Sequence, residues 1–254
     1  MKFLIFMFAL CLVRAKFTTK NYCCLSCKEK HVMCQYPDKN KIGPKCNQFM
    51  SVNMDPAKVL YLCNRIKSVK GVFAGASDLM EMSWDIELQE MAQRWANQCP
   101  NASDSCRNTA RGEVNQIVDS VINEEFVLPT WESVFLKWYI EDIPSSVINE
   151  YADGRYRALS QLIWGETRWV GCGASSHIIE VGRVITLVCN YSPPGNVPSQ
   201  PVFNIKGGMC TNCPKGSFCS DKQNVNLCVP LGVPKIAINN ILLFIANILI
   251  FLSV

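Results

Sequence analysis

Two segments in the second half of the chain decide its fold class: residues 169–174 (WVGCGA) and residues 184–191 (VITLVCNY). Both are short and rich in β-branched or aromatic residues, a composition typical of strands. Residues 162–164 (LIW) and 177–181 (HIIEV) have the same character, and Val181-Gly182-Arg183 fits a hairpin turn. These segments predict an antiparallel sheet.

Three helices are predicted before the sheet. The first follows Pro56 and ends at Gly71, a residue type that often stops helices. The second has Asp85 in its first turn and carries an apolar face formed by Trp84, Leu88, Met91, Ala92 and Trp95. The third carries a similar stripe and places Glu141 beside it; the stripe is Trp131, Val134, Phe135 and Trp138. Helices followed by strands predict an α+β sandwich rather than a parallel nucleotide-binding sheet.

Composition narrows the class of protein. The chain has 254 residues, 49% of them hydrophobic, which is enough for one sizeable core. Its formal net charge is only +4 and it has no basic run, so a nucleic acid is not the expected partner. Its 15 cysteines are well above ordinary usage.

The two ends of the chain carry apolar segments. Residues 1–15 have the pattern of a signal peptide, and cleavage after Ala15 leaves 14 of the 15 cysteines, an even number that suits disulfides in an oxidising compartment. Residues 236–254 contain no charge and run to the last residue. We expect a lipid-anchor (GPI) signal, with Asn226 and Gly232 as candidate attachment residues. A terminal spanning helix and a buried helix are the alternatives.

Five regions follow from these patterns. Residues 1–15 are the signal peptide, 16–55 a disulfide-tied loop region without core elements, and 56–200 the main domain. Residues 201–234 form a cysteine-rich segment and 235–254 the hydrophobic tail. The segment contains Cys210-Thr-Asn-Cys213, Cys219 and Cys228, for which two disulfides are favoured over zinc because no second CxxC or histidine pair accompanies them.

Several motifs, taken together, resemble the CAP superfamily, and within it the insect venom antigen 5 group. The motifs are NYCCLSC (21–27), HVMC (31–34), WDIEL (84–88) with AQRWANQC (92–99), SQLIW (160–164) with VGCG (170–173), and LVCNYSPPGN (187–196). The resemblance implies a disulfide-rich, three-layer α-β-α sandwich. It also implies the disulfides Cys23–Cys34, Cys27–Cys106, Cys46–Cys99 and Cys172–Cys189. We further expect a Cys24–Cys63 bond, with the last four cysteines paired among themselves.

Many members of this superfamily hold a divalent metal in a cleft with two histidines and two acidic residues. At the corresponding positions this chain has Ser103, Gln116, Glu141 and Ala158, so only Glu141 is kept. Glu113 is an alternative to Gln116 because the register of residues 111–117 is uncertain. One carboxylate without an imidazole cannot hold zinc tightly. His31 and His177, which are the only histidines, are expected in a loop and in a strand, so we predict no metal and no cofactor.

Other catalytic constellations are weak. No histidine is placed to activate Ser160, which is expected to be a structural strand hydroxyl. An even cysteine count argues against a free cysteine nucleophile. We therefore expect a secreted or surface-tethered, non-catalytic protein that binds an extracellular protein partner through the residual cleft. A lipid or sterol carrier and a residual hydrolase are the alternatives. Glycosylation is expected at Asn101 but not at Asn190, which lies within a predicted strand.

Overall fold

The computed structural model describes residues 22–23, 30–152, 154–220 and 226–231. The predicted signal peptide and the hydrophobic tail therefore lie outside the described residues. Within the part of the chain that is described, no helix has both the length and the apolarity needed to cross a bilayer.

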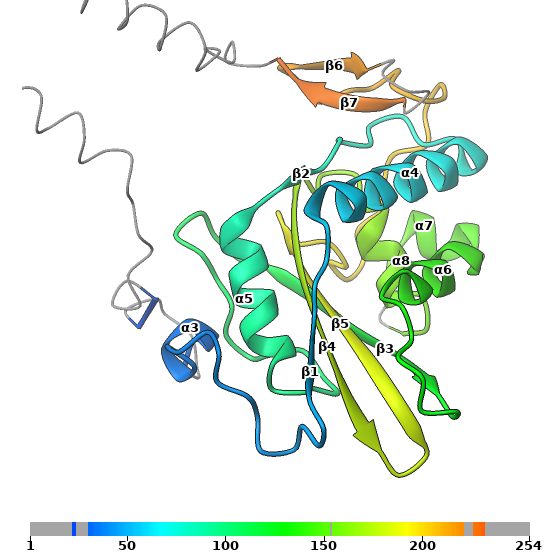
Figure 1. The fold of residues 1–254 in the computed structure, drawn as a ribbon. Helices are drawn as coiled ribbons and strands as arrows, with labels where there is room; N and C mark the ends of the chain where they lie inside the picture. Colours follow the sequence, from blue (N-terminus) through cyan, green and yellow to red (C-terminus); the bar gives the residue numbers. More distant parts are fainter. Residues whose placement is uncertain (1–21, 24–29, 153, 221–225, 232–254) are drawn as a thin grey trace, which may run out of the picture.

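The fold is a three-layer α-β-α sandwich, as expected (Figure 1). The central sheet has the strand order β1-β4-β5-β3, and β2 pairs with β4. Helix α5 covers one face, while α4, α6 and α8 cover the other face and enclose the main core. The elements in chain order are α3 (Val32–Gln35), β1 (Met50–Val52), α4 (Pro56–Ala74), β2 (Ser83–Trp84), α5 (Ile86–Ala96), β3 (Asn115–Asn123), α6 (Glu132–Ile140), α7 (Ser145–Asn149), α8 (Arg157–Leu162), β4 (Trp169–Ile179), β5 (Gly182–Ser192), β6 (Ser217–Ser220) and β7 (Leu227–Pro230).

Strands β4 and β5 form the predicted antiparallel hairpin, with the pairing running from Trp169↔Ser192 to Ile179↔Gly182. Residues 169–174 and 177–181 were expected to be separate strands, but β4 is continuous through Ile179. The strand predicted at 162–164 is wrong because Leu162 ends α8. Leu159, Leu162 and Ile163 are all fully buried at helical spacing, and so short an apolar run suits a helix as well as a strand.

Helix α4 begins at the N-cap Asp55, whose side chain accepts a hydrogen bond from the Ala57 backbone N–H. The predicted stop at Gly71 is wrong, since the helix continues to Ala74 and ends at Gly75, which has a φ of 72°. Gly71 has a packing role instead. A Cβ at this position would lie 2.3 Å from Leu79 Cδ1, so only glycine fits there without movement of Leu79.

Helix α5 lies directly on the sheet because β4 has glycines beneath it. A Cβ on Gly171 would lie 2.2 Å from the Gln89 nitrogen, and one on Gly173 would lie 2.4 Å from Gln93 Cα. The helix is also shorter than predicted. Trp84 belongs to β2, and Asp85 is the N-cap, whose side chain accepts a hydrogen bond from the Leu88 N–H.

The N-terminal segment 16–55 was expected to contain no core element, which is wrong for its described residues. Val32 and Met33 of α3 are buried in a second core cluster beside α5. Strand β1 pairs antiparallel with β4, with Met50 opposite Ser176. Short apolar stretches between cysteines and lysines give no clear period, which explains why the sequence did not reveal them.

Three disulfides implied by the resemblance are present: Cys23–Cys34, Cys46–Cys99 and Cys172–Cys189. Cys106 is also disulfide-bonded, but its expected partner Cys27 lies outside the described residues. The Cys24–Cys63 bond is wrong. Cys63 is a free thiol on the inner face of α4, fully buried in the main core.

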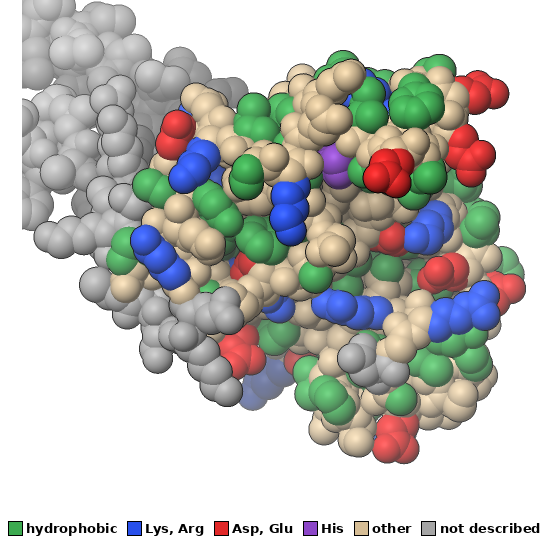
Figure 2. Space-filling model, turned by 90° about the horizontal axis from the view of Figure 1, so that it is seen from below, with side chains coloured by type: hydrophobic (Ala, Val, Ile, Leu, Met, Phe, Trp, Pro, Cys, Tyr) green, Lys and Arg blue, Asp and Glu red, His purple; other side chains and the backbone are tan. Residues whose placement is uncertain are grey.

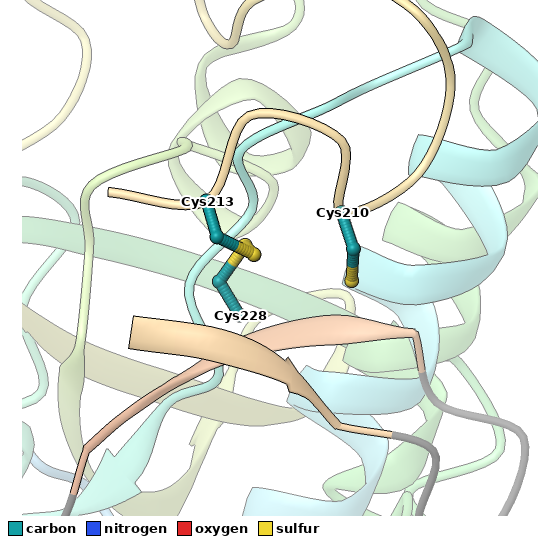
Figure 3. A group of neighbouring side chains, drawn as sticks. All are labelled: Cys210, Cys213 and Cys228. Carbon is teal, nitrogen blue, oxygen red and sulfur yellow. A yellow bond between two sulfur atoms is a disulfide. The ribbon is translucent and has the colours of Figure 1, made fainter. Parts of the chain in front are cut away.

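The last four cysteines pair among themselves, as expected, through Cys210–Cys219 and Cys213–Cys228. The sulfur atoms of Cys210, Cys213 and Cys228 lie within 4.8 Å of one another (Figure 3). Because all three are in disulfides, the cluster offers no thiolate to a metal ion.

The C-terminal module, which comprises β6, β7 and the disulfides Cys210–Cys219 and Cys213–Cys228, is hydrogen-bonded to the sandwich through its backbone. The Cys228 N–H donates to the Leu79 oxygen at 2.7 Å, and the Glu81 N–H donates to the Cys228 oxygen at 2.9 Å. Val202 and Phe203, in the connection to this module, are buried in the main core. The module is therefore an extension of the main domain rather than a separate unit.

Figure 2 shows the end of the molecule that carries the tip of the β4–β5 hairpin. Acidic, basic and apolar side chains are interspersed on this face rather than gathered into a field of one sign. The described residues of this end therefore form no basic stripe of the kind that marks a nucleic-acid interface.

Candidate functional site

The residual cleft is a pocket of about 210 Å³ between β3, α6 and the start of α8. It brings together two of the four predicted residues, Glu141 and Ala158. The other charged residues of its lining are Asp119, Lys137, Arg155 and Arg157. The pocket is therefore small and surrounded by charges of both signs.

Glu141 caps the C-terminal end of α6. Its Oε2 atom is buried and accepts no hydrogen bond from the described residues. Burial raises the pKa of this carboxyl and the nearby Asp119 adds to the effect, while Lys137, Arg155 and Lys70 oppose it. Lys70 Nζ bonds to the backbone oxygen of Glu141 at 2.6 Å rather than to its carboxylate.

Asp119 is a site residue that the sequence analysis missed. Its Oδ1 accepts a bond from Lys137 Nζ at 2.6 Å, and its Oδ2 accepts one from Trp138 Nε1 at 2.7 Å. Side chains alternate along β3, so Asp119 faces α6 on the same side as the core residue Ile117. Counting two residues on from Ile117 could have identified it.

Arg157 joins the cleft to Ser103. Its Nη2 donates to Ser103 Oγ at 2.9 Å and to the Gln116 backbone oxygen at 3.2 Å. The Ser103 hydroxyl in turn donates to the same Gln116 oxygen at 3.0 Å. Ser103 therefore lies beside the cleft and is held by hydrogen bonds there, although it does not line the pocket.

Gln116 was expected in the cleft, and this is wrong. Its side chain is fully buried on the opposite face of the sheet, where it bonds to Asp104 and to Asn190 Oδ1. Asn190 Nδ2 continues this network to the Leu88 oxygen of α5. Strand alternation explains the difference, because Gln116 and Asp119 project from opposite faces of β3. The alternative residue, Glu113, does not line this pocket either.

Neither histidine lines the cleft. His31 is the N-cap of α3, where Nδ1 accepts from the Met33 N–H at 3.1 Å and Nε2 lies 2.8 Å from the Asn108 oxygen. His177 lies in β4 opposite Val184, and burial together with Arg183 lowers its pKa. The two histidines therefore lie away from Glu141 and Ala158.

Ser160 has a structural role. It is fully buried and its hydroxyl bonds to the Tyr156 oxygen at 2.8 Å and to Asn196 Oδ1 at 2.7 Å. It lies in α8 rather than in the expected strand. The two sequons also differ: Asn101 is exposed after α5, whereas Asn190 is fully buried, so only Asn101 is accessible to glycosylation.

A second hollow is an apolar groove of about 450 Å³ between α4 and α6. Tyr61 and Leu136 line it and are 52% and 60% exposed, so the groove presents apolar side chains to solvent. Lys58 and Arg65 also line the groove, and Lys58 pairs with Glu132 at 2.6 Å.

Comparison with known proteins agrees with this architecture. Residues 60–191 match the model of the cysteine-rich secretory protein (CAP) family. Venom allergen 3 homolog from Dinoponera quadriceps is 31% identical over 211 residues, covering 73% of this chain and 90% of that protein. Venom allergen 5.02 from Vespa crabro is 29% identical over 209 residues, covering 73% of this chain and all of that protein.

Among solved structures, the fold is similar to hookworm platelet inhibitor, with a TM-score of 0.54, 18% identity, and coverage of 74% of this chain and 97% of that one. NaASP2 with Zn²⁺ also has a TM-score of 0.54, with 17% identity, and coverage of 74% of this chain and 100% of that one. The disulfides and the relation to venom allergens indicate an extracellular protein. The chain belongs to the cysteine-rich secretory protein (CAP) family and is an antigen 5-like member of it.

Proposed function

We propose that this protein is a non-catalytic CAP module that recognises an extracellular protein through the cleft at Glu141 and Ala158. The observation that carries the proposal is the lining of the cleft. A pocket that binds zinc tightly needs imidazoles or several free carboxylates, whereas this one has no imidazole and combines Asp119 and Glu141 with a lysine, two arginines and the methyl group of Ala158.

The donor set does not fit a divalent metal. Of the two carboxylates that line the cleft, Asp119 is already bonded to Lys137 and to Trp138 Nε1. Glu141 is left as a single free carboxylate, and one oxygen donor is too few for tight zinc binding.

The described residues also contain no paired nucleophile and base at the cleft. The Ser160 hydroxyl is bonded to structural partners, and the Cys63 thiol is fully buried in the core. Residual hydrolysis remains testable with a broad peptide and ester screen. Activity that is lost in Glu141→Ala would contradict a non-catalytic role.

The test of recognition is saturable binding of labelled protein to cells or extracellular matrix. Ala158→Trp fills the cleft, and the matched control Ala152→Trp adds the same bulk at an exposed position outside it. We expect at least about a tenfold loss of affinity for the first variant and no change for the control. Equal binding by both variants would show that the cleft is not the recognition site.

Lipid carriage is the second candidate, favoured by the exposed apolar groove between α4 and α6. A carrier should retain cargo through purification, which native mass spectrometry and a lipid extract would detect. Leu136→Asp should then remove the cargo, while Leu231→Asp, at an exposed position outside the groove, should not.

Attachment to the cell surface through residues 235–254 is part of the proposal. Expression in secretory cells followed by a phosphatidylinositol-specific phospholipase tests it. Release by the enzyme supports the lipid anchor, retention indicates a spanning helix, and free secretion shows that the tail does not anchor the protein.

A further inference from the structure

The cleft contains an acceptor to which none of the described residues donates a hydrogen bond. Glu141 Oε2 is buried and has no hydrogen-bond partner among the described residues. A buried carboxylate oxygen in this state is unfavourable, and such atoms in native proteins usually have a partner. Because Glu141 lines the cleft, a further donor to its carboxylate can come from solvent or from a ligand that enters the pocket.

Three of the four cations around Glu141 form hydrogen bonds to other groups. Lys137 bonds to Asp119 at 2.6 Å, and Lys70 bonds to the Glu141 backbone oxygen at 2.6 Å. Arg157 donates to Ser103 and to the Gln116 oxygen. Arg155 is exposed and, within the described part of the chain, contacts the Tyr156 ring at 5.8 Å rather than a carboxylate. If one of these four side chains turned to donate to the Glu141 carboxylate, it would lose the contact described here.

The size and walls of the cleft indicate what enters it. About 210 Å³ is below the roughly 300–1,000 Å³ of typical small-molecule sites, so the pocket suits one side chain of a larger partner. Ala158 and Ile117 supply apolar surface for a methylene stem. Arg155 and Arg157 are exposed and attract a carboxylate on the ligand.

We propose that the cleft binds a lysine or arginine side chain of a partner, with its cationic nitrogen donating to the Glu141 carboxylate and an adjacent carboxylate of the same partner facing Arg155. This inference rests on the proposed recognition role of the cleft and specifies its ligand. A basic group flanked by an acidic one matches both the buried acceptor and the exposed arginines.

The probe is Nα-acetyl-lysine, which carries an ammonium and a free carboxylate, titrated into the full chain by NMR or calorimetry. Nα-acetyl-norleucine lacks only the ammonium, and Nα-acetyl-lysine amide lacks only the carboxylate. We expect norleucine binding to be weaker by about tenfold or more, and the amide to be weaker by about two- to fivefold.

Three variants locate the effect. Glu141→Gln keeps the shape and should weaken Nα-acetyl-lysine binding about tenfold, and Ala158→Trp should abolish it. The control Asp142→Asn removes an exposed carboxylate on the next residue and should change binding less than twofold. Thermal unfolding of each variant verifies its folding.

Equal binding of lysine and norleucine derivatives, or binding that Glu141→Gln leaves intact, would overturn the inference. No binding of Nα-acetyl-lysine would also overturn it. Recognition through the cleft would still be decided separately by the Ala158→Trp cell-binding assay, so the two failures are distinguishable.

Discussion

Gln116 and Asp104 hold each other through two hydrogen bonds. Gln116 Oε1 accepts from the Asp104 backbone N–H at 2.8 Å, and Gln116 Nε2 donates to Asp104 Oδ2 at 2.9 Å. Burial raises the pKa of Asp104, while Arg107 and the bond from Gln116 oppose the shift. The pair joins β3 to the loop after α5, so Gln116 stabilises the wall behind the cleft rather than its interior.

Gln116→Leu should lower the free energy of unfolding by about 3 kcal/mol, because it leaves buried polar groups of Asp104 and Asn190 without partners. Guanidinium unfolding measures the loss. Gln35→Leu is the control, since Gln35 is exposed and should change stability by less than about 0.5 kcal/mol. A cost below about 1 kcal/mol at Gln116 would contradict the structural role.

Gly173→Ala should destabilise the protein by about 3 kcal/mol or more, because its Cβ would lie 2.4 Å from Gln93 Cα. Gly165→Ala is the matched control, since a Cβ there meets its nearest neighbours at an ordinary 3.5 Å. Thermal unfolding compares the two. Similar unfolding temperatures for the two variants would contradict the close contact between α5 and β4.

Cys63 should resist alkylation in the native protein. Burial raises the pKa of its thiol to about 12, so almost no reactive thiolate exists at pH 8. Iodoacetamide should modify Cys63 only after the protein has been unfolded, in the absence of a reductant. Peptide mapping detects the modified residue. Detection of Cys63 in a disulfide-linked peptide would contradict its assignment as a free thiol.

Lys67 should make stability depend on pH. The amine is fully buried and donates to the Thr167 oxygen at 3.0 Å, and burial lowers its pKa to about 7. Between pH 7 and the ordinary lysine pKa near 10.4, the unfolded chain binds more protons than the folded one, so stability rises with pH. The stability of wild type relative to that of Lys67→Met should therefore rise between pH 7 and 9, by up to about 1.4 kcal/mol per unit.

Urea unfolding at pH 7, 8 and 9 measures this difference directly. The variant also loses the bond to Thr167, which adds a cost that does not change with pH. A difference between the two proteins that is flat over this range would contradict the lowered pKa.

Zinc should neither bind at micromolar concentration nor raise the melting temperature at neutral pH. The cleft presents Glu141 and a lysine-bound Asp119 in place of imidazoles. Calorimetry of the purified protein tests this, and a micromolar site would contradict the proposed loss of metal binding.

The sequence predicted the sandwich because its signals are local. The hairpin around Cys172 and Cys189 follows from β-branched composition, and α6 follows from the spacing of its aromatic residues. Its errors have equally local causes. A three-residue apolar run at 162–164 does not distinguish a helix from a strand. Gly71 does not end its helix, because it is a glycine for packing reasons: Leu79 occupies the space that a side chain would need.

The candidate site was harder to predict because it depends on strand register. Glu141 was identified from a motif that fixes its place at the end of a helix. Gln116 and Asp119 are three residues apart on β3, and this odd separation puts their side chains on opposite faces of the sheet. An alignment error of an odd number of residues therefore assigns a buried residue to the cleft. Cys63 shows a similar limit, because an even cysteine count does not reveal which thiols remain free.

The backbone bonds between Cys228 and residues 79–81 also have a mechanical consequence. A pulling force applied beyond Pro230 would not extend a loose linker, because β7 is hydrogen-bonded to the sandwich. It would act along β7 and be transmitted, through the Leu79 and Glu81 amide–carbonyl contacts and the Cys213–Cys228 crosslink, to the segment that leads into β2. Under tension the sandwich and its cysteine-rich appendage would respond together.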